Sequence, residues 1–199
     1  MKKNHSKGGI VMSFIFEYVK HPRRIGAVAP SGKRLSRKMM APIDFGSADV
    51  IVEYGPGTGS FTRELIANRK PGTALILVEQ NEHFCRELET RYGDLGNVYI
   101  IHGDAGDIGR YLWELGYDKA DYIVSGLPFT SLPRNVSDNI LTATKTALGE
   151  RGKFITFQYS LLKRRFFERY FSITDYQKEV RNLPPAYVLV MQNQGEKYA

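Results

Sequence analysis

The spacing of apolar residues alternates from residue 49 onward between a pattern typical of strands and one typical of helices. Short apolar runs predict strands at Asp49–Tyr54, Thr73–Glu79, Asn97–His102, Asp121–Ser125 and Lys153–Tyr159. Amphipathic segments between them predict helices at Thr58–Asn68, Glu82–Arg91, Gly106–Leu115 and Arg134–Leu148. Strands separated by helices of this length form βαβ crossovers. We therefore expect a parallel sheet covered by helices on both faces.

The end of the chain departs from this alternation. A basic helical segment at Leu161–Tyr170 is followed by two strand-like runs, Ser172–Arg181 and Ala186–Asn193. The four residues between these runs are too few for a helical crossover, so the runs should form an antiparallel hairpin at the edge of the sheet. A length of 199 residues with 42% hydrophobic residues suits one domain with a full core. The pattern thus predicts a single α/β domain with five parallel strands and a C-terminal hairpin.

A glycine-rich motif joins the first predicted strand to the helix that follows it. The sequence from Val50 reads Val-Ile-Val-Glu53-Tyr54-Gly55-Pro-Gly57-Thr-Gly59. Glycines at these positions let the backbone turn tightly and approach a ligand, and a helix N-terminus favours negative charge. We expect these residues from Glu53 to Gly59 to line a cofactor site.

Acidic residues follow three neighbouring strands where such a cofactor would lie. Glu53 ends the first strand, and Glu79, followed by Gln80, ends the second strand twenty residues past the last glycine of the motif. A carboxylate at the second position accepts both hydroxyls of a ribose and rejects a 2′-phosphate. After the third strand, Asp104 and Ala105 stand where a short acid can meet the amino group of adenine. The spacing therefore predicts a ligand that contains adenosine.

Two other nucleotide sites fit the motif less well. A nicotinamide dinucleotide site has a Gly-x-Gly-x-x-Gly pattern, and its third glycine is absent here. A phosphate-binding loop requires Gly-Lys-Ser/Thr, which is also absent. A dinucleotide fold has no general need for the acid at Glu53, whereas a methyltransferase uses it around the methionine part of S-adenosylmethionine (SAM). We therefore predict SAM as cofactor and a Rossmann-like, seven-stranded methyltransferase fold.

The loop after the fourth strand is the predicted acceptor site. It reads Ser125-Gly126-Leu127-Pro128-Phe129. In an open α/β sheet this end of the strand borders the cofactor crevice, so the loop should face the methyl group. We expect its first three residues to contact SAM. The alternative is a Gly-Pro turn that only closes a strand.

Positive charge is concentrated at the N-terminus. The formal net charge is +7, yet residues 1–40 hold ten Lys and Arg residues against one acid, which leaves −2 for the rest of the chain. A helix through Ile10–Lys20 would place Ser13, Glu17 and Lys20 on a narrow polar stripe beside a wide apolar face. Such a segment suits an anionic membrane surface or a nucleic acid. The alternatives are a solvated basic face and a helix that covers the domain's own core.

We accordingly divide the chain into a basic, amphipathic, helical segment over residues 1–40, acting at a membrane or as a lid, and a methyltransferase domain over residues 41–199. No apolar run approaches the length that spans a bilayer. Charged residues between the apolar run Ile10–Phe16 and the small-residue triplet Ala27–Ala29 argue against a signal peptide. The single cysteine, Cys85, permits no intrachain disulfide and lacks the partners of a metal site, so we expect a reducing, cytosolic compartment and no metal.

These motifs together resemble the bacterial phospholipid N-methyltransferases, which methylate phosphatidylethanolamine. The resemblance covers nearly the whole chain and rests on three segments: Phe16–Ser31, the SAM loop Glu53–Gly59 and the acceptor loop Ser125–Pro128. It implies a SAM-dependent enzyme with a phospholipid amine as substrate. It also implies a cytoplasmic protein bound peripherally to the inner face of the cell membrane.

A second family, the ribosomal RNA adenine dimethyltransferases, shares the glycine motif. Its acceptor loop reads Asn-Leu-Pro-Tyr, where this chain has Gly126-Leu-Pro-Phe129. Gly126 has no side-chain amide to hold an exocyclic amine, and the chain ends where those enzymes carry a helical RNA-binding domain. RNA recognition by stacking and flipping needs such a platform. RNA is therefore the less favoured acceptor. Two more hypotheses are a small soluble amine as acceptor and a binding protein without turnover.

Transfer to an amine requires a neutral nitrogen, so a proton must leave first. Tyr18 is the first candidate for contacting the amine, because the N-terminal segment should cover the site, and Tyr159 at the end of the fifth strand is the second. Either could instead be an ordinary packed tyrosine. Ser31 and Ser125 are expected polar contacts near the cofactor. The cations available for a lipid phosphate are Arg23, Arg24, Lys163, Arg164 and Arg165.

Overall fold

The structure is a computed structural model that describes residues 30–129, 131–160, 164–180, 182 and 185–194. Among these residues its helices are α2 (Pro30–Met40), α3 (Ser60–Asn68), α4 (Glu82–Tyr92), η1 (Ala105–Asp107), α5 (Ile108–Glu114), α6 (Arg134–Ala147) and α7 (Arg164–Phe167). Its strands are β1 (Val50–Tyr54), β2 (Ala74–Glu79), β3 (Val98–His102), β4 (Ala120–Ser125), β5 (Leu148–Gln158), β6 (Phe171–Glu179) and β7 (Ala186–Asn193).

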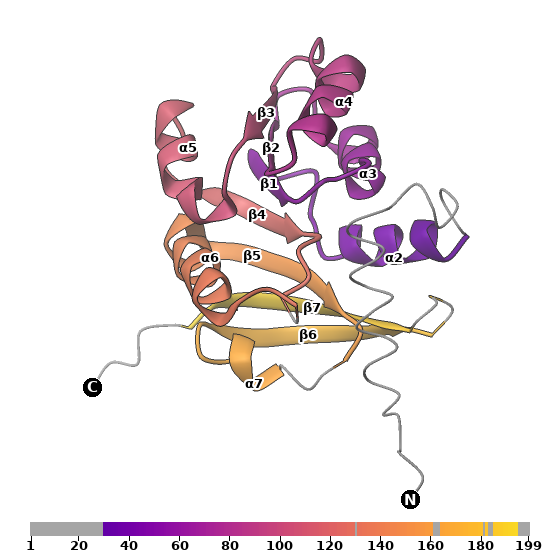
Figure 1. Cartoon of the computed structure of the whole chain (residues 1–199), viewed down its shortest axis with the longest axis vertical. Coiled ribbons are helices and arrows are strands. Elements are labelled where there is room, and N and C mark those ends of the chain that lie inside the picture. The colour runs from indigo at the N-terminus through magenta and orange to yellow at the C-terminus, as the bar shows by residue number, and fades with distance from the viewer. Residues whose placement is uncertain (1–29, 130, 161–163, 181, 183–184, 195–199) are drawn as a thin grey trace, which may run out of the picture.

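Seven strands form one sheet in the order β3-β2-β1-β4-β5-β7-β6 (Figure 1). The strands β1 to β5 run parallel, and β7 is antiparallel to both β5 and β6. The predicted Rossmann-like fold with a C-terminal hairpin is therefore confirmed. The hairpin turns back so that its second strand, β7, pairs with β5, and its first strand, β6, forms the edge.

The largest departures from the predicted elements lie around β5. This strand begins at Leu148, earlier than predicted, and its pairing with β4 is irregular there: Ala120 pairs with Leu148, whereas Tyr122 pairs with Lys153. Where the sequence predicted a helix over Leu161–Tyr170, the described residues form only the single turn of α7. Helix α2 falls inside the predicted basic segment. The predicted helix over Ile10–Lys20 lies outside the described residues, and the division of the chain at residue 40 stays a prediction.

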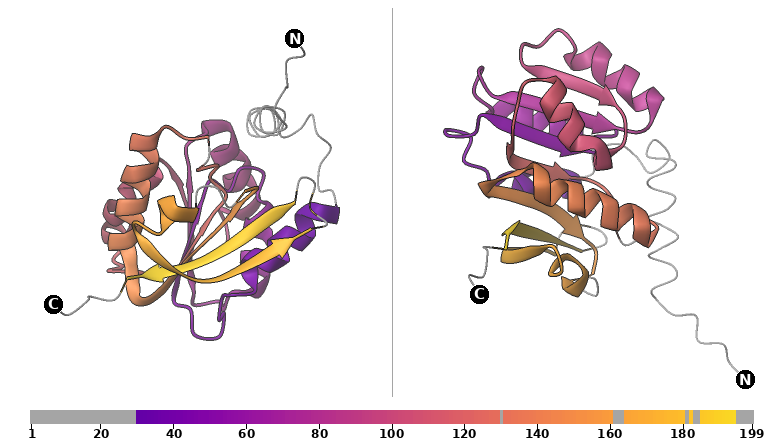
Figure 2. Two further views of the ribbon diagram at one scale, coloured as in Figure 1. Left: turned by 90° about the horizontal axis from the view of Figure 1, so that it is seen from below. Right: turned by 90° about the vertical axis from the view of Figure 1, so that its left-hand side faces the viewer.

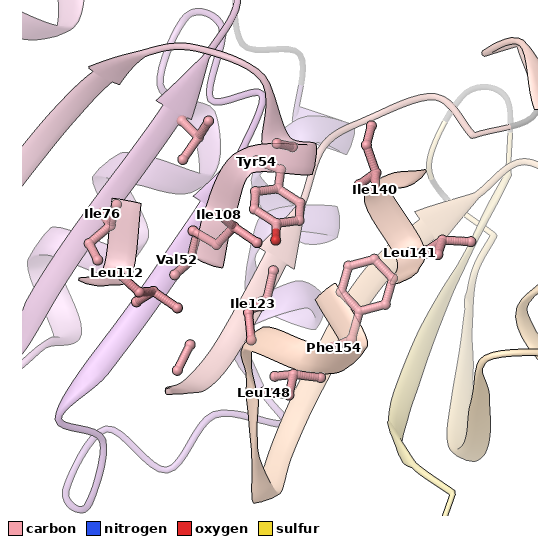
Figure 3. Close-up of a cluster of buried hydrophobic side chains, with 14 of the residues drawn as sticks. Val52, Tyr54, Ile76, Ile108, Leu112, Ile123, Ile140, Leu141, Leu148 and Phe154 are labelled. Atoms are coloured by element: carbon pink, nitrogen blue, oxygen red, sulfur yellow. The ribbon is translucent and has the colours of Figure 1, made fainter. Parts of the chain in front are cut away.

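Helices cover both faces of the sheet, as Figure 2 shows. On one face α5, α6 and α7 pack over strand residues that include Val52, Ile76 and Phe154, and Figure 3 shows this cluster. On the other face α2, α3 and α4 pack against residues such as Ile51 and Leu77. Both β1 and β2 are buried along their whole length, because they lie at the centre of the sheet between two helical layers.

Candidate active site

The glycine loop after β1 adopts the backbone conformation that the motif requires. Gly55, Gly57 and Gly59 have φ angles of 63°, 53° and 81°, in the left-handed region that L-residues with a Cβ rarely adopt. The amide of Gly55 donates to the carbonyl oxygen of Val78 on β2 at 2.9 Å, which holds the loop against the neighbouring strand. A Cβ placed on Gly57 would meet no atom within 4 Å. The loop is therefore tightly turned and has open space above its middle glycine.

Glu53 places a buried carboxyl group beneath this loop. The side chain is fully buried, and its Oε2 accepts a hydrogen bond of 2.8 Å from the Thr62 hydroxyl on α3. Its Oε1 is buried and has no hydrogen-bond partner in the part of the chain that the structure describes. Burial raises the pKa of Glu53 to about 8, and the nearby carboxylate of Glu79 adds to the rise, while the bond from Thr62 opposes it. An unpaired buried acceptor is costly, so this atom fits a donor from a ligand.

Glu79 ties the glycine loop to the end of β2. Its Oε2 accepts from the amide of Gly57 at 2.9 Å, and its Oε1 accepts from the amide of Asn81 at 2.8 Å. The side chain is buried, yet each carboxylate oxygen keeps a second lone pair that can accept a hydroxyl. The predicted ribose acid therefore also shapes the loop that would bind the rest of the cofactor.

The polar residues that end β2 and β3 lie beside each other. Oδ2 of Asp104 lies 3.4 Å from Nε2 of Gln80, and His102 Nε2 lies 3.0 Å from the Gln80 carbonyl oxygen. Oδ1 of Asp104 accepts from the amide of Gly106 at 2.7 Å, which begins η1, and Ala105 is buried next to it. The structure thus brings the predicted adenine residues to the same edge of the sheet as Glu79.

The acceptor loop after β4 packs directly on the glycine loop. The amide of Gly126 donates to the Tyr54 carbonyl oxygen at 2.9 Å, and the amide of Leu127 lies 3.2 Å from the hydroxyl oxygen of Ser125. A Cβ on Gly55 would approach Leu127 Cδ2 to 2.8 Å, and a Cβ on Gly126 would approach the Gly55 carbonyl oxygen to 3.0 Å. The two loops therefore pack closely at both glycines, with the Leu127 side chain against Gly55 and Gly126 against the Gly55 carbonyl oxygen.

Phe129 anchors the far end of the acceptor loop. Its ring is fully buried and packs edge-on against Phe154 of β5 and Phe167 of α7, with ring centroids 6.1 and 5.5 Å apart. Edge-to-face aromatic pairs of this kind add to the stabilisation from burial. The loop is thus fixed at its start by Gly126 and at its end by an aromatic cluster.

The tyrosines singled out in the sequence occupy different places. The Tyr54 side chain lies in the core beneath α6, its hydroxyl 3.3 Å from the Thr144 hydroxyl, so the contribution of Tyr54 to the loops is made by its backbone (Figure 3). Burial raises the pKa of the Tyr54 hydroxyl. Tyr159 follows β5 and packs edge-on against Phe157 on the face that α2 and α3 cover. Tyr18 and the side chain of Ser31 lie outside the described residues.

Two residues of the site were not singled out from the sequence. Thr62 is a polar residue on the buried side of α3, one turn beyond the last glycine, and that position could have indicated a partner for Glu53. Phe129 ends the acceptor loop, and only its apolar character hinted at an anchor. The roles of both residues follow only from the way the helices pack on the sheet.

The geometry fits SAM. The orphaned acceptor of Glu53 suits the positively charged amino end of the methionine part, and the open space above Gly57 leaves room for the chain that follows. Glu79 and Asp104 stand at the ends of successive strands, where a ribose and an adenine would follow in order. Among the described residues, no cluster of three or more His, Cys, Asp or Glu side chains could hold a metal ion.

The fold and this site define a class of enzyme. The structure superposes with a TM-score of 0.68 on 1,6-didemethyltoxoflavin-N1-methyltransferase of Burkholderia thailandensis, solved with S-adenosylhomocysteine, at 14% identity over 98% of this chain and 92% of that one. The protein is a SAM-dependent methyltransferase, and SAM is its cofactor. It is also 34% identical over 175 residues to the ornithine lipid N-methyltransferase of Singulisphaera acidiphila, covering 87% of this chain and 91% of that protein. The chain belongs to the family of that lipid methyltransferase.

A weaker similarity connects the chain to RNA-modifying enzymes. A probable ribosomal RNA small subunit methyltransferase A of Methanosarcina barkeri is 31% identical over 93 residues. That match covers 47% of this chain and 29% of the archaeal protein. No protein-family profile matches the chain. Of these two sequence similarities, the one to the lipid enzyme spans more of the chain.

Proposed function

We propose that this enzyme transfers a methyl group from SAM to the amine of a membrane aminolipid, such as phosphatidylethanolamine or an ornithine lipid. The observation that carries the proposal is the similarity to an ornithine lipid N-methyltransferase over 87% of the chain. The matches to the ribosomal RNA enzymes of Methanosarcina barkeri and Sulfurihydrogenibium cover 47% and 56% of the chain, and 29% and 42% of those enzymes. A lipid amine is thus better supported than an adenine amine.

The acceptor loop supports the same choice. An adenine-directed loop of the Asn-Leu-Pro-Tyr type would need a side chain at position 126, and here a Cβ would stand 3.0 Å from the Gly55 carbonyl oxygen. That approach is closer than ordinary van der Waals contact, so one of the two loops would have to move. With glycine at position 126, the acceptor loop has no side-chain amide there. Such a loop suits a flexible alkylamine better than a planar base.

The chain's own residues supply alignment, desolvation and removal of a proton. Glu53, Glu79 and Asp104 would hold the cofactor. When bound, SAM supplies an activated methyl group, which the nitrogen lone pair takes up while the sulfur keeps the electrons of the broken bond. The acceptor loop, fixed between Gly126 and Phe129, orients the amine and excludes water from it. We propose Tyr18 as the first candidate, and Tyr159 as the second, for the group that contacts the amine while it loses its proton.

Exposed basic residues on helix α2 support the proposal that the enzyme binds a membrane. Leu35 and Met39 are buried against the sheet, whereas Lys33, Arg34 and Arg37 are exposed and form no ion pair within the described part of the chain. In Figure 1, α2 lies on the side toward which the arrowheads of β4 and β5 point, which is the edge that carries the site. No described helix is long and apolar enough to cross a bilayer. We propose peripheral association with an anionic inner membrane surface.

Transfer of radiolabelled methyl from SAM tests the proposed substrate. The acceptors are offered in parallel: liposomes with phosphatidylethanolamine, liposomes with ornithine lipid, and total RNA. We expect label in the lipid phase, lost in Glu53→Gln and kept in the matched control Glu150→Gln, an exposed acid on β5. Label in RNA alone would contradict the lipid proposal and favour RNA as the substrate, as in the ribosomal RNA methyltransferases.

Co-sedimentation with vesicles tests the proposed surface. Replacement of Lys33, Arg34 and Arg37 by Gln should weaken binding to phosphatidylglycerol vesicles at least about tenfold, because each basic residue near an anionic surface contributes about 1 kcal/mol. Binding to phosphatidylcholine vesicles should stay low throughout. The control variant replaces three exposed cations on other helices, which are Arg86, Arg110 and Lys145. Equal losses in both triple variants would contradict a role for α2.

A further inference from the structure

A second buried polar group without a partner lies at the end of β5. Gln158 is 3% exposed, and its Nε2 makes no hydrogen bond in the described structure. Buried side-chain amides in folded proteins are nearly always hydrogen-bonded, because an unpaired one loses its contacts with water and gains none in return. Such a group therefore requires either a structural partner or a ligand.

The register of the sheet places Gln158 at the end of the sheet from which the acceptor loop leaves. Ser125, the last residue of β4, pairs with Thr156, so Gln158 lies two residues beyond this pair, at the end of β5. Side chains alternate between the faces of a strand, which puts Gln158 on the same face as Phe154. The ring of Phe154 packs against Phe129 at the end of that loop. The amide thus lies at the carboxyl edge of the sheet, the edge at which the predicted acceptor loop leaves β4.

A matching observation comes from the other end of the acceptor loop. Ser137 lies in the first turn of α6, the helix that follows the loop in the chain, and its Oγ is buried and likewise without a partner among the described residues. Ser137 is a residue of α6, one of the helices that cover the face of the sheet on which Gln158 lies. Two buried polar atoms on this side of the sheet, Gln158 Nε2 and Ser137 Oγ, thus have no hydrogen-bond partner among the described residues.

We propose that the carboxamide of Gln158 binds the acceptor amine. Its Oε1 accepts a hydrogen bond from an N–H of the neutral amine, and its Nε2 donates to a neighbouring oxygen of the head group. The bond to the N–H fixes the rotation of the nitrogen and so directs its lone pair. This inference rests on the methyltransferase activity, and on the proposed function only for the choice of lipid.

The proposal has a consequence for successive methylations. A neutral primary amine has two N–H bonds and a monomethylated amine has one, whereas a neutral dimethylated amine has none. Oε1 of Gln158 can therefore hold the first two acceptors and not the third. A residue that serves only to support the fold would affect all three transfers alike.

The test compares Gln158→Met with Gln192→Met. Methionine keeps the length and volume of the side chain without its amide, and Gln192 is a glutamine at the opposite end of the hairpin, where its Nε2 reaches the Arg151 carbonyl oxygen. Mixed micelles present phosphatidylethanolamine or its monomethyl or dimethyl derivative, and the same series is made for the ornithine lipid. We expect Gln158→Met to lower kcat/KM about 100-fold for the unmethylated and monomethyl lipids, which lose the bonds to both Oε1 and Nε2, and about tenfold for the dimethyl lipid, which loses only the bond from Nε2.

Three further readings decide the outcome. For Gln158→Met, the dimethyl lipid loses only the bond from Nε2, so its kcat/KM should fall about tenfold less than that of the other two lipids. The KM for SAM should stay within about twofold of wild type, and the thermal midpoint should not fall. Gln158→Asn keeps the amide but withdraws it by one methylene, so it should show the same pattern and serves if the methionine variant does not fold. Equal losses on all three lipids, or no loss on any, would overturn the proposal.

The two proposals fail in different ways. If wild type labels RNA and no lipid, the lipid proposal fails, and the variants are compared on RNA, where Gln158→Met should still reduce labelling about tenfold. If wild type labels lipid and Gln158→Met matches it, the role of Gln158 is wrong and the proposed function stands.

Discussion

The two halves of the site are held by different forces. In the cofactor half, backbone amides carry the structure: Gly57 and Asn81 donate to Glu79, and Gly106 donates to Asp104. In the acceptor half, side-chain packing holds the loop in place, because Phe129 packs against aromatic rings from β5 and α7. The bonds from Asn81 to Glu79 and from Gly106 to Asp104 join residues only two apart in the sequence, whereas the rings of Phe154 and Phe167 that surround Phe129 come from distant segments. The comparison predicts that the two halves can be damaged separately.

The largest expected effect is that of Phe129→Ala. Removing a fully buried ring costs about 3–5 kcal/mol in the free energy of unfolding. Methyl transfer should fall with it, while the affinity of the remaining folded protein for SAM stays within about threefold. Urea unfolding and calorimetric titration with SAM measure the two quantities. Trp113→Ala, at a position 79% exposed, is the control and should change stability by less than about 0.5 kcal/mol. A parallel loss of SAM affinity would show that the halves are not held separately.

Next in size is the effect of Glu53→Gln on the cofactor half. The substitution removes the buried charge at the amino end of the proposed SAM site and should weaken SAM binding about 100-fold, in line with a hydrogen bond between charged groups. Because the pKa of Glu53 is raised to about 8, the affinity of wild type for SAM should rise with pH up to that value and level off above it. The variant should show no such rise. A pH-independent affinity in wild type would contradict ionisation of Glu53 on binding.

The same substitution should affect stability in the opposite sense. Between the ordinary glutamate pKa of 4.5 and about 8, the unfolded chain releases this proton and the folded chain keeps it. The unfolded state therefore binds fewer protons than the folded state. Titration of Glu53 thus lowers the free energy of unfolding as the pH rises through this window. SAM-free Glu53→Gln should thus have a higher thermal midpoint than wild type at pH 8 and a similar one near pH 4.5. Thermal scans at both pH values measure the difference.

Gly55→Ala tests the contact between the halves. An alanine there must adopt a φ of 63° and would crowd Leu127, so we expect a loss of about 1–3 kcal/mol in stability and a fall in methyl transfer. Leu127→Ala should relieve the crowding and leave the backbone strain, so a double-mutant cycle should give a favourable coupling. Gly72→Ala, where a Cβ meets open space, is the control. Additive effects would show that the loops do not press on each other.

The smallest effect is expected from Thr62→Val. The hydroxyl of Thr62 donates to Glu53 and lowers its pKa, so its removal should move the pH dependence of SAM binding to higher pH. At pH 8 the affinity should fall by less than about tenfold, because the charge of Glu53 is still available. Isothermal titrations across the pH range measure the shift. An unchanged profile would mean that the hydroxyl bond does not control the ionisation of Glu53.

Much of the cofactor half could be predicted from the sequence. The glycine loop, the acids at the ends of β1, β2 and β3 and the strands that carry them follow from local spacing, because each lies a fixed number of residues from a turn. The acceptor half could be predicted only in outline. The loop from Ser125 was recognised, but the partners of Phe129 and the position of Gln158 depend on β5, α6 and α7. A polar residue in phase with Phe154 along β5 was the one available signal for Gln158.

The sequence by itself determined the order of strands and helices, the C-terminal hairpin and the cofactor motif, because these depend on periodicity and turn residues within short segments. The tertiary structure decided that β7 lies between β5 and β6, that Tyr54 points into the core, and that the two loops meet at Gly55 and Gly126. It also decided which buried polar atoms lack a partner. Hydrogen-bond satisfaction depends on every neighbour in space, and no stretch of sequence contains them all.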